Sequence, residues 1–207
     1  MRNLVINEFI EKTASESPTP GGGSVSALLA ALSSSLAAMS ASLTINKKGY
    51  EDIQDKMIEV KKELTEHGSL FLDSMNKDVE AFNNFMSAYR LKRDTEEEKE
   101  YRKSQIQLKA KEALFVQTEL IEGIGKMIDT MKYCYYHGNV NVRSDALNAV
   151  IIARAAVLSC LSTIDANLII IKDEELKSSV NNNVNRIKDE IINLEKELIK
   201  DSLSISL

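Results

Sequence analysis

Hydrophobic residues recur every three or four positions along most of the chain, which is the spacing of one face of an α-helix. The longest such stripe is made by Ile53, Met57, Val60, Leu64, Phe71, Met75, Phe82, Phe85 and Tyr89. Residues 143–171 are apolar nearly all round, which predicts a central helix packed on every side. Residues 173–204 carry one apolar edge among alternating lysines and glutamates, which predicts an outer helix.

Helix-breaking residues gather in one short window. Both prolines of the chain and three of its eight glycines lie between residues 18 and 23. No alternating run of β-branched residues is bounded by turns, and the chain lacks tryptophan. The pattern therefore predicts an all-α protein in which residues 1–207 form a single-domain bundle of about six mostly long helices. The expected helices span residues 2–15, 23–46, 51–90, 94–136, 143–171 and 173–204.

The helix expected at residues 23–46 consists mainly of alanine and serine. A helix with so little apolar bulk gains packing energy only where another backbone approaches it closely. Its neighbour is either the central helix of the same chain or the same helix of a second copy. We favour the second copy and expect a homo-dimer.

Composition narrows the classes of partner. The 26 Lys and Arg residues against 31 Asp and Glu residues give a net charge of −5, which disfavours nucleic acid as a partner. Two cysteines and two histidines are too few for a disulfide framework or a zinc site. We therefore expect reduced thiols and no metal.

The beginning of the sequence bears on location. Residues 1–15 show an amphipathic helical pattern rather than a cationic stretch followed by an apolar run, so we expect a cytoplasmic protein. The uncharged stretch Val25–Ile45 is long enough to span a bilayer. Its many serines lower its hydrophobicity well below that of a leucine-rich span, so we expect no membrane partner.

The glycine-rich window is the first candidate for a ligand site. Its glycines permit close approach to a ligand, and the following helix start offers unpaired N–H groups at its positive dipole end. Such a loop suits an anion or a polar planar group. The alternative is a plain structural turn in which Ser24 caps the helix.

A carboxylate on the long apolar stripe is the second candidate. At 100° per residue, Asp78 falls between Met75 and Phe82 and therefore points inward. Burial would raise its pKa and make it a usable general acid or base near neutral pH. The alternative is a structural ion pair with Arg90 or Arg143, or a residue that sets the register of a helix contact.

A short loop between two long helices, residues 138–145, is the third candidate. Asn139, Asn141 and Arg143 supply amide groups and a cation, which can hold a heterocycle or a carboxylate. Ser144 or Asp145 is expected to cap the central helix.

Two lysines, Lys47 and Lys48, follow the Ala- and Ser-rich helix directly. Positive charge at a helix C-terminus is an ordinary partner of the helix dipole. The same pair can attract the anionic tail of a ligand, and both interpretations stay open.

Taken together, these motifs resemble the C-terminal domain of formiminotransferase-cyclodeaminase and the related stand-alone methenyltetrahydrofolate cyclohydrolases. The resemblance covers nearly the whole chain and follows the order of the family's motifs. The motifs are Pro18–Val25 before an Ala/Ser-rich helix, Lys47-Lys48 with Tyr50, Asp78–Phe82, Ala88–Leu91, Gly138-Asn139 with Arg143–Asp145, and Ile164–Leu168 with Lys172-Asp173.

The resemblance implies an all-helical homo-dimer that acts on one-carbon units of a tetrahydrofolate derivative, without metal or nicotinamide. It implies that Asp78 is the catalytic residue. Two positions depart from the family pattern: Asn76 stands where a second aspartate is common, and Lys92 where proline is common. The candidate substrate-binding residues are Pro20, Gly21, Gly22, Gly23, Ser24, Lys47, Lys48, Arg90, Asn139, Asn141, Arg143, Ser144 and Asp145.

Three functions follow in order of preference. The first is the lyase reaction that closes 5-formimidoyl-tetrahydrofolate to 5,10-methenyl-tetrahydrofolate with release of ammonia. The second is the hydrolase reaction that opens 5,10-methenyl-tetrahydrofolate to 10-formyl-tetrahydrofolate. The third, from a different class, is a non-enzymatic helical dimer used for protein contacts.

Overall fold

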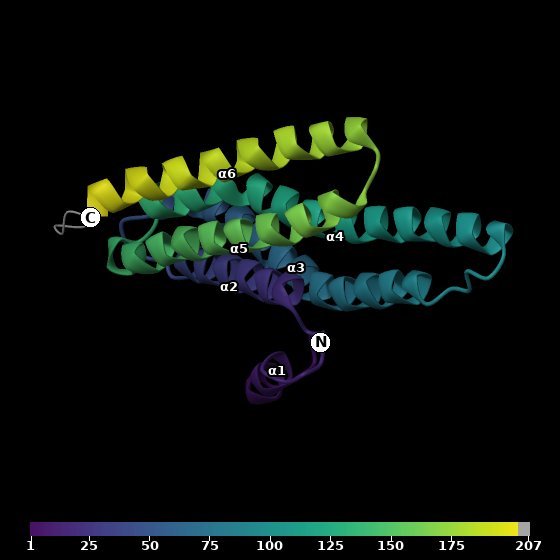
Figure 1. Ribbon diagram of the computed structural model, residues 1–207. Helices are drawn as coiled ribbons and strands as arrows, with labels where there is room; N and C mark the ends of the chain where they lie inside the picture. The colour runs from purple at the N-terminus through teal and green to yellow at the C-terminus, as the bar shows by residue number, and fades with distance from the viewer. Residues whose placement is uncertain (203–207) are drawn as a thin grey trace.

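Long helices lie side by side through most of the molecule, and no strand occurs in residues 1–202, the part that this computed structural model describes (Figure 1). The all-α class and the six helices are therefore confirmed. The helices are α1 (Ile6–Thr13), α2 (Gly22–Ser42), α3 (Gln54–Tyr89), α4 (Glu96–His137), α5 (Arg143–Ile170) and α6 (Glu174–Ser202), and two short 3₁₀ turns, η1 (Glu51–Ile53) and η2 (Val140–Val142), precede α3 and α5.

Helix ends differ from the expected ones by a few residues. The first helix spans Ile6–Thr13 rather than 2–15. The second ends at Ser42 rather than at 46, because the chain turns there and Asn46 takes a positive φ of 58°. The expected end of the last helix at residue 204, and the domain boundary at 207, lie outside the described residues.

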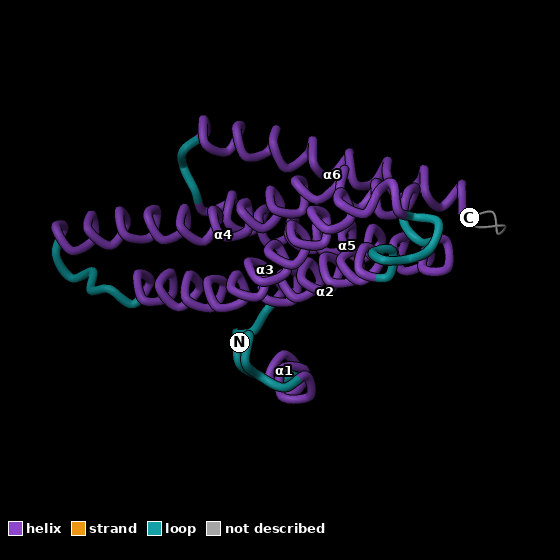
Figure 2. Tube along the Cα trace, turned by 180° about the vertical axis from the view of Figure 1, so that it is seen from behind, coloured by secondary structure: helices purple, strands orange, loops and turns teal. Residues whose placement is uncertain are grey.

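The four helices α2 to α5 form an up-and-down bundle, with α6 laid over α4 and α5 (Figures 1 and 2). Their buried side chains make one continuous core. α5 contacts α2, α4 and α6, but it is not packed on every side as predicted, because Leu158 and Ile169 are exposed. Glu195 of α6 forms an ion pair with Arg154 of α5 at 2.6 Å. The solvent-facing side of α6 is polar, as expected of an outer helix.

α2 packs through small residues against two helices of its own chain, α3 and α5. Ala30, Ala37 and Ala41 are fully buried, so the neighbouring backbones approach closely. Two of the buried serines donate their hydroxyls to carbonyl oxygens across the contact: Ser33 to Ala149 O at 2.8 Å, and Ser34 to Leu64 O. The close neighbours of α2 are therefore found within the chain, whereas the sequence favoured a second copy.

By length and composition, two segments could cross a bilayer: α2 and residues 140–170, which contain α5. In the fold, 61% and 44% of their most apolar windows are buried inside the protein. Packing within the bundle therefore accounts for part of their apolar character, and Leu32, Met39 and Ile169 remain exposed.

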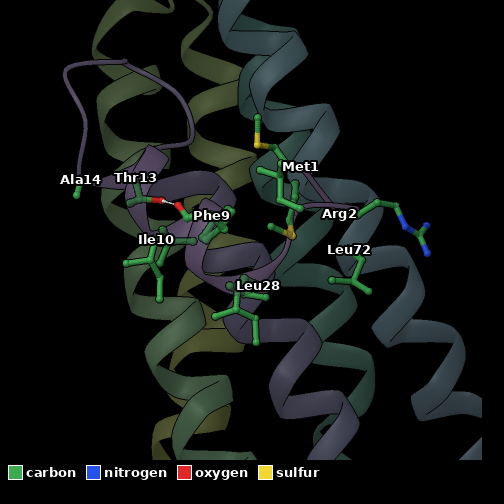
Figure 3. A pocket seen from close by; sticks show the side chains of 12 residues that line it. Met1, Arg2, Phe9, Ile10, Thr13, Ala14, Leu28 and Leu72 are labelled. Atoms are coloured by element: carbon green, nitrogen blue, oxygen red, sulfur yellow. Dashed lines mark hydrogen bonds between the residues drawn. The ribbon is translucent and has the colours of Figure 1, made fainter.

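α1 stands apart from the bundle at the N-terminal side of α2 (Figures 1 and 2). Among its residues only Phe9 is buried, whereas Ile6 is 80% exposed and Ile10 is 60% exposed. Figure 3 shows the cavity between α1 and the bundle, with Leu28 of α2 and Leu72 of α3 on the opposite wall; its volume is about 480 Å³. An apolar face of α1 is thus left without a neighbour.

Candidate active site

The carboxylate of Asp78 lies at the N-terminus of α2, where three elements meet. Ser24 Oγ donates a hydrogen bond to Oδ2 at 2.7 Å, and Gln117 Nε2 of α4 donates to Oδ1 at 2.7 Å. Each carboxylate oxygen therefore has one neutral donor. The inward orientation predicted from helical periodicity agrees with this position.

Burial raises the pKa of the Asp78 carboxyl above its usual range. The hydroxyl of Ser24, the backbone N–H of Ser24 and the amide of Gln117 oppose this shift, because each stabilises the charged form. No cation contributes within residues 1–202. The group is therefore held closer to neutrality than an exposed aspartate, as a proton donor requires.

The ion-pair interpretation of Asp78 is wrong. Arg90 is exposed at the end of α3, about three helical turns beyond Asp78. The guanidinium of Arg143 instead lies over the ring of Tyr135, 5.4 Å from its centroid. Neutral hydrogen-bond donors occupy the positions around the carboxylate that an arginine would need.

Gly23 is the residue that lets the carboxylate reach the helix start. A Cβ atom at this position would lie 2.0 Å from Asp78 Oδ1 and 2.4 Å from Gln117 Nε2, so only glycine fits. The N-cap of α2 is Gly21, and no side chain caps the helix. The expected capping role of Ser24 is therefore wrong: its hydroxyl binds Asp78 instead.

Gln117 is the site residue that the sequence analysis missed. Its side chain is only 2% exposed, and it interrupts the apolar series Leu114, Ile121 and Ile124 on α4. This is the same signal that identified Asp78, a polar residue on an apolar face, and it was available on α4 as well. Helical periodicity does not predict that Gln117 and Asp78, which lie on different helices, form a hydrogen bond.

A pocket of about 250 Å³ opens beside the carboxylate. α3, α4 and α5 continue past the start of α2, and the pocket occupies the space where α2 would continue. Two polar side chains of α5, Thr163 and Asn167, line one wall. The remaining lining residues are Asp78, Phe82, Phe85, Ala113, Gln117, Ala166 and Ile170. Apolar walls with a few polar groups are typical of a small-molecule site.

The loop 138–145 meets the chain at the opposite end of α2. Asn139 donates its backbone N–H to Thr44 Oγ1 at 2.8 Å and its side-chain amide to Leu43 O at 3.0 Å, so its polar groups hold two loops together. The helix α5 begins at Arg143 after the N-cap Val142. The expected capping by Ser144 or Asp145 is therefore wrong.

Apart from Arg90, which is exposed at the end of α3, the predicted site residues fall into two groups within one chain. Pro20 and residues 21–24 lie beside Asp78, whereas Lys47, Lys48 and residues 139–145 lie at the far end of α2. The 21 residues of α2 place these ends about 30 Å apart. A single chain does not bring the two groups into one pocket.

Among the described residues, no group of three or more His, Cys, Asp or Glu residues is arranged to hold an ion. The expectation of a metal-free site stays a prediction.

Comparison with known proteins gives a consistent family. The profile of the family described as Formiminotransferase-cyclodeaminase matches residues 5–186. The methenyltetrahydrofolate cyclohydrolase of Methylorubrum extorquens is 34% identical over 80% of this chain and 79% of that protein. The formimidoyltransferase-cyclodeaminase of Gallus gallus is 28% identical over 89% of this chain, which spans 34% of that longer protein. The crystal structure of formiminotetrahydrofolate cyclodeaminase from Thermotoga maritima superposes with a TM-score of 0.86 at 29% identity, over 96% of this chain and 95% of that chain.

We expect Gly23→Ala to disrupt the site and lower the free energy of unfolding by about 1–3 kcal/mol, because its Cβ must displace Asp78 and Gln117. The matched control is Gly22→Ala, whose Cβ would meet only Thr163 Oγ1 at an ordinary 3.6 Å. Urea unfolding of both variants checks the prediction, and equal stability of the two would contradict it.

Proposed function

The chain belongs to the formiminotransferase-cyclodeaminase family, and we propose that it closes 5-formimidoyl-tetrahydrofolate to 5,10-methenyl-tetrahydrofolate with release of ammonia. Family membership makes it an enzyme of folate one-carbon chemistry. The observation that carries the choice of ring closure is the half-buried carboxyl of Asp78, because its raised pKa favours the protonated form that can supply the proton ammonia needs to leave.

Ring closure needs a group that moves protons at one carbon atom. The anilino nitrogen N10 attacks the formimidoyl carbon, and the N10 proton must leave as the new C–N bond forms. The amino group on that carbon must then be protonated so that the C–N bond breaks and ammonia departs. Asp78 accepts the first proton and supplies the one that ammonia needs, leaving the methenyl cation.

The pocket places this carboxyl against apolar walls. Phe82 and Phe85 cover one side, and Gln117 and Thr163 supply polar contacts on the other. A volume of about 250 Å³ lies below the roughly 300–1,000 Å³ typical of pockets that enclose a drug-sized ligand. The pocket therefore takes the reacting part of the folate and leaves the rest outside.

Ring hydrolysis is the second candidate. It is favoured by the 34% identity to the Methylorubrum extorquens cyclohydrolase, a protein that matches this chain over 79% of its own length. In that reaction the Asp78 carboxylate would activate a water molecule that attacks the methenyl carbon. The third alternative, a non-enzymatic helical dimer, is disfavoured because the relatives are named as enzymes.

The two substrates, supplied separately, distinguish the candidates. With 5-formimidoyl-tetrahydrofolate we expect the methenyl absorbance to rise and one ammonia to appear per ring closed. With 5,10-methenyl-tetrahydrofolate we expect little change in absorbance beyond the buffer reaction. Rapid loss of the methenyl absorbance, without ammonia release from the first substrate, would assign ring hydrolysis instead.

Asp78→Asn removes the proton-transfer group and keeps its size. We expect turnover to fall about 10²- to 10⁴-fold. Stability should not fall at neutral pH, because the folded state disfavours the charged carboxyl. With its pKa raised by folding, Asp78 favours the folded state most at low pH and loses that contribution as pH rises through the folded-state pKa.

The control for this variant is Glu80→Gln, an exposed carboxyl on the same helix that should leave turnover unchanged. Thermal melts at several pH values accompany the kinetics. A folded Asp78→Asn protein with full turnover would remove Asp78 from the mechanism.

The candidate site residues lie at opposite ends of α2, and a second copy of the chain would bring the two groups together. Exposed apolar side chains follow one face of α2 at Leu32, Met39 and Leu43, and α1 adds Ile6 and Ile10. Such a patch is typical of a protein–protein contact. We propose that it forms the homo-dimer interface and that a two-fold axis crosses α2 near its middle, so that the two α2 helices run antiparallel.

This arrangement would complete the active site. The N-terminal half of one α2 then lies against the C-terminal half of the other, which brings Lys47 and Lys48 of the second copy near Asp78 of the first. Residues 139–145 of the second copy would lie there too, because Asn139 is hydrogen-bonded to Thr44. The lysines are exposed and free to meet the anionic glutamate tail of the folate.

Mixing two inactive variants tests the shared site. Asp78→Asn damages the half of the shared site that holds the acid. The double variant Lys47→Glu, Lys48→Glu damages the half that holds the lysines, at exposed positions. After mixing and exchange of subunits, half of the dimers are mixed and each holds one intact site, so activity should return to about one quarter of the parent's. A mass near 23.1 kDa, or no recovery in dimers shown to exchange, would refute the arrangement.

A further inference from the structure

We propose that Cys160 of α5 is a positioning residue that holds the amide of Gln117 in the orientation that Asp78 needs. The thiol donates to Gln117 Oε1 at a sulfur–oxygen distance of 3.0 Å, and Gln117 Nε2 donates to Asp78 Oδ1 at 2.7 Å. The inference deepens the proposed function, since it rests on Asp78 as the reacting group. It assigns the buried cysteine a part in the site without any reaction at sulfur.

The two ends of a glutamine amide are chemically opposite but nearly equal in shape. Nε2 carries two N–H donors, whereas Oε1 only accepts. If the amide of Gln117 turned over, its oxygen would face the Asp78 carboxylate and its NH₂ group would face the thiol. The first contact is repulsive and the second is weak, so the observed orientation depends on a donor beside Oε1.

Cys160 is the donor at that position. Its side chain is fully buried, and Gln117 is nearly so, which leaves water little access to the amide oxygen. Burial raises the pKa of the Cys160 thiol, and the negative charge of Asp78 raises it further. The S–H proton therefore stays in place throughout the pH range in which an enzyme is assayed.

Within one chain, the pKa of Asp78 is tuned by burial and by hydrogen bonds. α2 presents Gly23 and Ser24 to the carboxylate, α4 presents Gln117, and α5 presents the thiol and Thr163. The nearest charged side chains on its own helix, Lys77 and Glu80, are exposed, and Lys77 pairs with Glu119 of α4. Of the described residues, none adds a charge–charge contribution to the pKa of Asp78.

The test follows the Asp78 carboxyl directly and without catalysis. The pKa of Asp78 is measured in the full chain by carbon NMR after labelling aspartate carboxyl groups with ¹³C, and Asp78→Asn identifies the signal. Two variants remove the donor: Cys160→Ala, and Cys160→Val, which better fills the space. Cys160→Ser restores an O–H donor.

A matched control is available in the second buried cysteine. Among the described residues, the thiol of Cys134 in α4 hydrogen-bonds to a backbone carbonyl, Ala37 O at 3.7 Å, and Cys134→Ala removes the same atom from a different part of the core. It reports what the loss of a buried thiol does by itself.

In the donor-free variants we expect the pKa of Asp78 to rise by about 0.5–1 unit, because the amide of Gln117 no longer favours the charged form. Cys160→Ser and Cys134→Ala should stay near the parent value. The limb of the pH–rate profile that belongs to Asp78 should move to higher pH in the same variants, whether the acid or the carboxylate form is the active one.

An unchanged pKa of Asp78 in a folded Cys160→Ala or Cys160→Val protein would overturn the proposal, and so would an equal rise in Cys134→Ala or Cys160→Ser. A shifted pKa with no shift in the rate profile would instead count against Asp78 as the reacting group. The failure of the positioning role and the failure of the proposed function are thereby separated.

Discussion

The close approach of α2 to its neighbours is the constraint on which the rest of the structure depends. Its buried face offers only glycine, alanine and serine, so α3 and α5 pack directly on its backbone. At the N-terminus of α2, a Cβ on Gly23 would overlap the carboxylate of Asp78. The packing that stabilises the bundle thus also sets the position of the reacting group against the first N–H groups of the helix.

Burial and hydrogen bonding act on Asp78 in opposite directions. Removal from water raises its pKa, while Ser24 and Gln117 lower it by binding the charged form. Among the described residues of one chain, no cation contributes to this balance. Neutral donors leave the carboxyl able to exchange a proton, which is the property that either ring closure or ring hydrolysis of a folate requires.

The separation of the site residues along α2 explains why a dimer would be needed to form a complete active site. One chain carries an acid in a small pocket at one end and lysines with an asparagine loop at the other. An antiparallel pair of α2 helices would bring the two ends together twice, once for each copy. Exposed apolar residues of α1 and α2 would supply the contact between the copies.

Periodicity along the sequence was sufficient for the helices and for the inward direction of Asp78, because both are local properties of a chain that turns 100° per residue. The same pattern contained Gln117, but not its partner, since the two residues lie on different helices. The register between helices decides whether Gln117 reaches Asp78 and which way its amide faces. It also decides how closely Gly23 approaches the carboxylate. Register is decided by how small side chains let backbones interlock across the bundle, and only the tertiary structure contains that information.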